Sequence, residues 1–167
     1  MKVFGFTGYS NAGKTTLIER LIPRFIGQGL KVSLIKHAHH GFDVDRPGKD
    51  SYRHREAGAS EVMLVSDQRW ALMHELREEP EPVLATLLAR LSPCDLVLVE
   101  GFKTSDLPKL EVHRAGNGKP LIYPGSANIV ALVSDVQPDV PVPCFGLDDV
   151  EAVAAFILRH LGLAPSC

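Results

Sequence analysis

The stretch GFTGYSNAGKTTLIERL, residues 5–21, decides the fold. It fits the pattern G-x-x-x-x-G-K-T, which begins at Gly8 and ends at Thr15. Glycines in such a loop let backbone N–H groups turn toward one point, and the helix that follows adds its positive N-terminal end. Lys14 would then reach the β- and γ-phosphates, while the Thr15 hydroxyl would bind Mg²⁺. The stretch therefore predicts a phosphate-binding loop for a nucleotide.

The residues on both sides of this loop have the context that the motif requires. KVFGFTG, residues 2–8, is typical of a short buried strand, and the apolar residues of 17–26 recur at helical spacing. Pro23 is expected to kink this helix or end it early. KVSLIKH, residues 31–37, predicts a second strand. A strand, a helix and a strand in this order predict a parallel sheet with a right-handed crossover.

The rest of the chain alternates further strands with helices. A short basic helix is expected at 51–59, and the runs 60–67 and 69–76 predict a hairpin with its turn near Asp67 and Gln68. An amphipathic helix is expected at 81–91, and Asp148 with Glu151 predicts a capping box before a last helix. The remaining predicted strands are 95–101, 109–114, 128–135 and 142–146. The predicted fold class is α/β, a three-layer P-loop NTPase fold whose mainly parallel sheet carries an antiparallel hairpin annex.

The overall composition is that of an ordinary globular protein. Its 167 residues predict one domain, 1–167, and 45% of them are hydrophobic. The net charge of −2 gives no reason to expect nucleic-acid binding, and no apolar run approaches the ~20 residues that span a membrane. The N-terminus does not have the pattern of a signal peptide. Three widely spaced cysteines, Cys94, Cys144 and Cys167, favour a reducing, cytoplasmic setting.

A second acidic residue is expected to orient the Mg²⁺ from the end of a neighbouring strand. The run DLVLVEG offers Asp95 at its beginning and Glu100 at its end. Five strand residues span ~16 Å, so both carboxylates cannot reach the site. Ligands bind beyond the carboxyl ends of parallel strands, which favours Glu100. The alternative is that Glu100 is only a turn residue before Gly101.

The polar loop after the second predicted strand allows several roles. It contains two carboxylates, Asp43 and Asp45, and three histidines, His37, His39 and His40. We expect this loop to respond to nucleotide, with one aspartate, for which Asp45 is the candidate, near the Mg²⁺ shell. A zinc site is the alternative, although the spacing is not that of a structural zinc site. Solvent-exposed polar residues are the simplest alternative.

Two further features suggest binding without specifying a ligand. Lys49 and Arg53 share one face of the basic helix, which would hold an anionic group, a partner protein or only solvent. Asp135 ends a predicted strand, where a carboxylate could read the guanine N1–H and 2-amino groups. It could equally be a turn residue, and no N-K-x-D motif is present.

Three segments together resemble one known family, the molybdopterin-guanine dinucleotide biosynthesis protein B (MobB) family. These segments are GYSNAGKTTL, VSLIKHAHHGFDVDRPGKDSYRHREAGA and LVLVEGFK, and the second is the most specific. The resemblance extends from Lys2 to about Leu161 and is weakest from Lys109 to Pro143.

The resemblance implies a GTP-binding, usually homodimeric protein with weak GTPase activity. Such a protein would assist a guanylyltransferase of the MobA type in making molybdopterin guanine dinucleotide, with molybdopterin as a candidate ligand. Glu100 and Gly101 would form the second nucleotide motif, and residues 37–51 a switch-like segment. Catalytic candidates are Lys14, Asp45 and Glu100, and Mg²⁺ candidates are Thr15, Glu100 and Asp45. The nucleotide-binding candidates are Gly8, Ser10, Asn11, Ala12, Gly13, Lys14, Thr15, Thr16, Gly101 and Asp135.

Three classes of function stay open from the residues. The first is a GTP-binding accessory protein with slow hydrolysis, the second a small-molecule kinase with a lid around Arg53, and the third a non-catalytic, nucleotide-dependent adapter. The hairpin is also a plausible dimer edge, because exposed sheet edges invite pairing. Its residues Met63, Trp70 and Met73 would lie either in that interface or in the core.

Overall fold

The computed structural model describes residues 1–38 and 41–163. It divides the chain into two compact units, Met1–His37 with Leu84 onward, here called the sheet unit, and Ala38–Val83, here called the small unit. The assignment of residues 1–167 to one domain stays a prediction.

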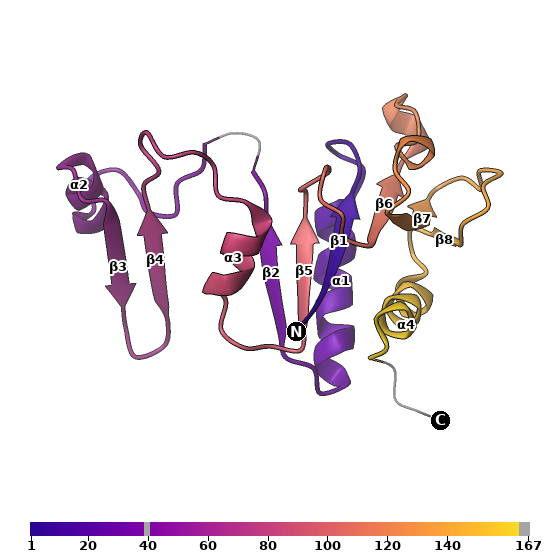
Figure 1. Ribbon diagram of the computed structural model, residues 1–167, viewed down its shortest axis with the longest axis horizontal. Helices are drawn as coiled ribbons and strands as arrows, with labels where there is room; N and C mark the ends of the chain where they lie inside the picture. Colours follow the sequence, from indigo (N-terminus) through magenta and orange to yellow (C-terminus); the bar gives the residue numbers. More distant parts are fainter. Residues whose placement is uncertain (39–40, 164–167) are drawn as a thin grey trace. The chain divides into compact units, whose positions relative to one another are not determined.

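The sheet unit is built on a six-stranded sheet in which every neighbouring pair is parallel (Figure 1). The strand order is β2-β5-β1-β6-β7-β8, so β1 lies inside the sheet between β5 and β6. The strands are β1 Lys2–Thr7, β2 Val32–Lys36, β5 Leu96–Glu100, β6 Lys109–His113, β7 Ile129–Ser134 and β8 Cys144–Gly146. This order confirms the predicted parallel sheet.

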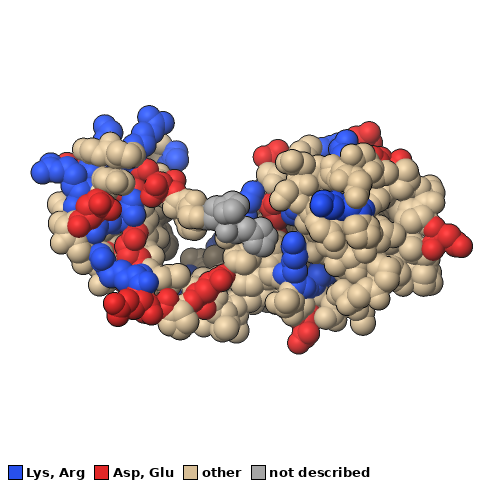
Figure 2. Space-filling view, turned by 90° about the horizontal axis from the view of Figure 1, so that it is seen from above, with Lys and Arg blue, Asp and Glu red and all other residues tan. Residues whose placement is uncertain are grey.

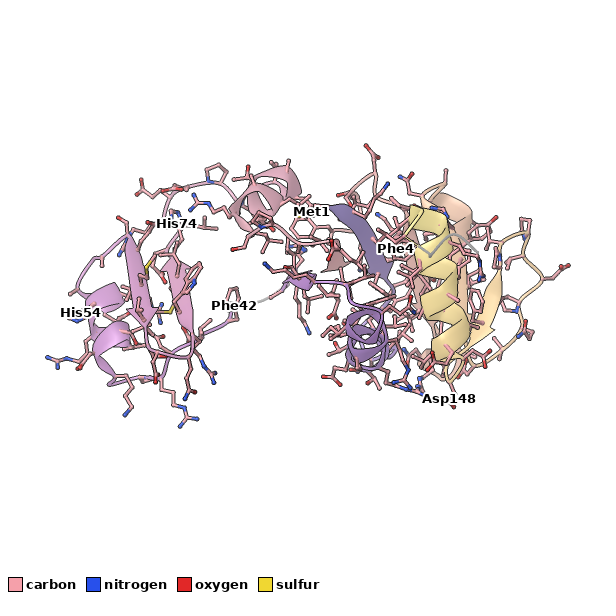
Figure 3. The ribbon with its side chains drawn as sticks, turned by 90° about the horizontal axis from the view of Figure 1, so that it is seen from below. Met1, Phe4, Phe42, His54, His74 and Asp148 are labelled. Carbon is pink, nitrogen blue, oxygen red and sulfur yellow. The ribbon has the colours of Figure 1, made fainter. Side chains whose placement is uncertain are left out.

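The helices of the sheet unit are α1 Lys14–Gly27, α3 Leu84–Arg90 and α4 Val150–Leu161. Apolar residues of α1 and α4, such as Leu21 and Ile157, belong to one core cluster with Phe4 and Leu98 of the sheet. These two helices therefore cover the same face of the sheet, and the side chain of labelled Phe4 lies beside α4 in Figure 3. β5 is buried along its whole length, as its run of apolar residues predicts for a central parallel strand.

Two local features of the helices in the sheet unit differ from expectation. Pro23 does not end its helix early, because α1 continues as one element to Gly27, and the alternative, a kink at Pro23, stays a prediction. The capping box also fails, because Asp149 is the residue before α4 and its carboxylate accepts the Gly146 N–H at 2.8 Å. Asp148 and Glu151 instead form ion pairs with α1, through Arg20 and Arg24 respectively. The two acidic residues join two helices rather than capping one.

The small unit contains α2 Asp50–Glu56 and the strands β3 Glu61–Val65 and β4 Trp70–His74. The strands pair antiparallel, which confirms the predicted hairpin. In its turn the Ser66 hydroxyl accepts the N–H groups of Gln68 and Arg69, both at 3.2 Å. Within this unit Met73 is buried, whereas Met63 and Trp70 are exposed.

Candidate nucleotide-binding site

The loop between β1 and α1 has the backbone that a phosphate-binding loop requires. Gly8 has φ +141°, and a Cβ there would lie 2.3 Å from the carbonyl oxygen of Val112, so only glycine fits. Gly13 has φ +101°, and Asn11 adopts φ +62° although it carries a side chain. Asparagine is one of the few residues that enter this region, and such outliers concentrate at functional sites.

Lys14, the first residue of α1, folds back over this loop. Its Nζ donates hydrogen bonds to the carbonyl oxygens of Gly8 at 3.0 Å and Tyr9 at 2.9 Å. Burial lowers the pKa of Lys14, and the opposing attraction comes from Glu100. The ammonium group is therefore held beside the loop, where a phosphate would meet it.

Thr15 and Glu100 meet at the carboxyl end of β5. The Thr15 hydroxyl lies 3.0 Å from Oε1 and 3.3 Å from Oε2 of Glu100, whose side chain is 8% exposed. Asp95 lies at the opposite end of the strand, where its carboxylate accepts the Lys31 N–H at 2.7 Å. The structure thus brings Glu100, and not Asp95, to the phosphate loop.

The Thr15–Glu100 pair fits a magnesium ion in chemistry and in spacing. Mg²⁺ prefers oxygen ligands at 2.0–2.1 Å in an octahedron, whose adjacent ligands lie about 3.0 Å apart. The Thr15 and Glu100 oxygens have this separation. Among the described residues there is no group of three or more His, Cys, Asp and Glu side chains that would form a separate metal site.

The turn after Glu100 is as tightly packed as the phosphate loop. Gly101 has φ +99°, and a Cβ there would lie 2.8 Å from the Cβ of His37. The His37 ring also lies against the Phe102 ring, with centroids 4.8 Å apart. Close contact between these two strand ends explains why a glycine follows the acidic residue.

Two lysines at this site were missed by the sequence analysis. Lys36 ends β2 directly opposite Glu100 in the strand register, and its Nζ lies 3.3 Å from Thr15 Oγ1 and 3.5 Å from Glu100 Oε2. Lys103 places its Nζ 5.7 Å from the centre of the Tyr9 ring. Lys36 could have been found by the rule that identified Glu100, because parallel strands end at the same edge of the sheet.

A buried lysine holds the loop that carries Lys103. Lys109, the first residue of β6, is 2% exposed. Its Nζ donates to the carbonyl oxygens of Lys103 at 2.9 Å and Ser105 at 2.6 Å, and burial lowers its pKa. These bonds satisfy the buried ammonium and fix the loop beside the phosphate loop.

Asp135 lies at the same edge of the sheet, and its carboxylate accepts the Ala115 N–H at 2.8 Å. Ala115 begins a short 3₁₀ helix, η1 Ala115–Asn117. From the end of η1, the Asn117 side chain donates to the Ser10 carbonyl oxygen at 3.3 Å. Asp135 thus supports a segment that contacts the phosphate loop, and its role as a base reader stays a prediction.

A hollow of ≈ 340 Å³ lies beside this contact. Its lining residues are Tyr9, Ser10, Asn11, Asn117 and Lys119. Of the other predicted loop residues, Ala12 is buried and donates its N–H to Tyr9, and Thr16 is exposed on α1.

The predicted switch-like segment falls mostly in the small unit. Asp45 is paired with Arg55 at 2.6 Å, and a hydrogen bond from that guanidinium lowers the pKa of Asp45. Arg55 also holds Asp43 at 3.1 Å. A magnesium role for Asp45 stays a prediction that requires its carboxylate to leave Arg55. The histidines His39 and His40 lie outside the described residues.

The family follows from comparison with known proteins. Residues 3–135 match the sequence profile of the family MobB, described as molybdopterin guanine dinucleotide synthesis protein B. The chain belongs to the MobB family. It is 42% identical over 162 residues to the molybdopterin-guanine dinucleotide biosynthesis adapter protein of Escherichia coli (strain K12), which covers 95% of this chain and 93% of that protein.

Other members of the MobB family agree in sequence and in fold. The adapter protein of the same name from Haemophilus influenzae (strain ATCC 51907 / DSM 11121 / KW20 / Rd) is 51% identical over 122 residues, which is 71% of this chain and 67% of that protein. A crystal structure of molybdopterin-guanine biosynthesis protein B (mobB) superposes with a TM-score of 0.76 at 30% identity, covering 95% of this chain and 99% of the other. The predicted P-loop NTPase fold is confirmed.

Proposed function

We propose that this chain binds GTP with Mg²⁺ at residues 8–16 and acts as an adapter in molybdopterin guanine dinucleotide biosynthesis. The observation that carries the nucleotide part is the convergence of Lys14, Thr15 and Glu100 on one loop. The biosynthetic role is supported by the relatives of this chain, which are named molybdopterin-guanine dinucleotide biosynthesis adapter proteins. When bound, Mg²⁺ would neutralise phosphate charge from the side of Thr15 and Glu100.

Slow hydrolysis belongs to this proposal. The two carboxylates of the polar loop, Asp43 and Asp45, both pair with Arg55. A carboxylate engaged with a guanidinium is a poor proton acceptor, because its charged form is already stabilised. A faster reaction would need a group supplied by a second protein, as stabilising arginines are in other nucleotide hydrolases.

The test is calorimetric titration of the purified chain with GTP and, separately, with ATP, both with Mg²⁺. We expect GTP to bind more tightly. Lys14→Ala should reduce triphosphate affinity by about 100-fold, as expected for a lost charge-assisted contact of about 3 kcal/mol, without unfolding the chain. Glu100→Gln should weaken the Mg²⁺-dependent binding of the nucleotide. Lys2→Ala, at the exposed far end of β1, is the matched control for Lys14→Ala.

Each outcome of this titration points to one class of function. Equal affinity for ATP and GTP would remove the guanine part of the proposal and favour a small-molecule kinase, which would release diphosphate only with an acceptor present. Unchanged affinity in the Lys14→Ala variant would overturn the phosphate site itself. Binding without turnover, together with altered affinity for a MobA-type guanylyltransferase, would favour a purely conformational adapter.

A homodimer through the hairpin is the second part of the proposal. Met63 lies opposite Leu72 and Val65 lies opposite Trp70, so four apolar side chains share one face of the ribbon. All four are exposed. An apolar face of this kind favours association with a second copy of the chain.

Sedimentation equilibrium tests the dimer. Trp70→Lys should shift the mass toward that of a monomer, and Val136→Lys, at an exposed apolar residue of the sheet unit, is the control. An unchanged dimer in the Trp70→Lys variant would exclude this face as the dimer interface.

None of the described helices is long and apolar enough to cross a membrane.

A further inference from the structure

The Lys36 ammonium lies against the two side chains, Thr15 and Glu100, that would hold a metal ion. Its Nζ is 3.3 Å from the Thr15 hydroxyl and 3.5 Å from one Glu100 oxygen. The same two residues offer the oxygen pair suited to Mg²⁺. Lys36 therefore supplies, from the protein itself, the positive charge that an almost fully buried carboxylate requires.

This ammonium and a divalent ion held by Thr15 and Glu100 would compete for one contact, the Thr15 hydroxyl oxygen. Both are cations, and at such short range their repulsion is strong compared with thermal energy. Arrival of a metal–nucleotide complex thus requires the Lys36 side chain to move. The side chain is 53% exposed, so solvent offers it an open path.

The backbone beneath Lys36 is fixed, which limits where the side chain goes. β2 pairs with β5 along its full length, and the next N–H, that of His37, donates to the Glu100 carbonyl oxygen at 2.8 Å. The stem therefore stays at the carboxyl edge of the sheet, beside Lys14. A bound triphosphate would bring its terminal phosphate to Lys14, and this anion would lie within reach of the displaced ammonium.

We propose that Lys36 is a cation that exchanges places with Mg²⁺. Without nucleotide it neutralises Glu100 and holds the Thr15–Glu100 pair together. With Mg²⁺ and a triphosphate it moves from those oxygens to the terminal phosphate, so it favours triphosphate over diphosphate. This inference rests on the proposed function of the same site.

The experiment measures binding of GTP and GDP by calorimetry over a series of free Mg²⁺ concentrations. Lys36→Met keeps the length of the side chain and removes its charge. We expect the Mg²⁺ concentration for half-maximal GDP binding to fall about three- to fivefold, the size of a half-exposed charge interaction. The preference for GTP over GDP at saturating Mg²⁺ should fall about tenfold, because a charge-assisted contact is lost.

Lys103→Met is the matched control for general electrostatics. It removes the same charge near Lys14, but Lys103 lies against the Tyr9 ring rather than between Thr15 and Glu100. An equal fall in the Mg²⁺ requirement for both variants would overturn the exchange, since the effect would then be one of overall charge. A Lys36→Met variant with an unchanged Mg²⁺ requirement or an unchanged GTP preference would also overturn it.

The outcomes separate this inference from the proposed function. Failure of the unaltered chain to bind either nucleotide at any Mg²⁺ concentration would overturn both. Normal binding by the unaltered chain, combined with wild-type behaviour of Lys36→Met, would overturn the exchange alone. The two opposite changes expected in one variant, a lower Mg²⁺ requirement and weaker triphosphate preference, are not produced by a merely loosened fold.

Discussion

The two units of this chain hold together by different interactions. The sheet unit has a continuous apolar core, in which Phe4, Phe6 and Leu98 are completely buried. In the small unit, only Ser51 and Met73 are buried among the described residues. Figure 2 shows Lys and Arg side chains interleaved with Asp and Glu over the small unit. Burial of apolar side chains therefore accounts for how the sheet unit holds together, but it does not account for how the small unit does.

The small unit is organised around one guanidinium group. Arg55 of α2 pairs with Asp45 at 2.6 Å, with Glu75 at 2.8 Å and with Asp43 at 3.1 Å. Arg77 donates to two further carbonyl oxygens, those of Arg55 and Ala59. The Arg55 and Asp45 side chains are only 11% and 4% exposed, and a two-stranded sheet is marginal by itself. The phosphate loop therefore lies on the unit with the continuous apolar core, while the polar segment belongs to the unit that is organised around ion pairs.

The largest expected effect comes from opening a cavity in the sheet unit. Leu98→Ala should lower the free energy of unfolding by about 3 kcal/mol, because a completely buried side chain is lost from the central strand. Val83→Ala in the small unit should change it by less than about 0.5 kcal/mol, since Val83 is exposed and lies outside the hairpin proposed as the dimer face. Denaturant unfolding measures both, and similar losses would contradict the contrast between the units.

A smaller and local effect is expected when Arg55 is replaced. Arg55→Met leaves three carboxylates without their shared cation, so hydrogen-exchange protection of α2, β3 and β4 should fall while that of β5 stays the same. Arg53→Met is the matched control on the same helix, because Arg53 is exposed and lies 3.9 Å from Asp50. Unchanged protection in Arg55→Met would show that the ion network does not hold this unit.

The smallest expected effect is a pH dependence confined to the hairpin. His74 lies 2.8 Å from a Glu61 oxygen and 3.2 Å from a Glu79 oxygen, and these hydrogen bonds raise its pKa above 6.5. Its stabilising contribution is therefore complete below pH 6.5 and is lost as the pH rises through the raised pKa.

Hydrogen exchange of β3 and β4, corrected for intrinsic rates, measures this dependence. Protection should decline with increasing pH in the unaltered chain and should be independent of pH over this range in His74→Gln. Loss of stability in acid is a separate effect. Because the pKa of Asp45 is lowered from 3.8, the stabilising contribution of Asp45 is lost only below pH 3.8. A decline that persists in His74→Gln would assign the effect to another group.

Much of the candidate site could be predicted from the sequence, because its residues lie at strand ends or in a motif of fixed spacing. The motif predicted Gly8, Lys14 and Thr15. The rule that ligands bind beyond the carboxyl ends of parallel strands predicted Glu100. Asp149 was missed as the residue before α4, because Asp148 and Glu151 fit the capping pattern better than the tertiary ion pairs that engage them. Local sequence spacing cannot show that a side chain forms an ion pair with a residue of another helix.

By itself the sequence determined the parallel sheet, the hairpin and the phosphate loop, because periodicity and glycine spacing are local properties of the backbone. Only the tertiary structure decided the partners of Lys36, Lys109 and Asp135. Each of these side chains is held by groups distant in the chain or across a loop. Such contacts depend on which strand ends lie side by side, and strand order is set by packing of the whole sheet rather than by any one segment.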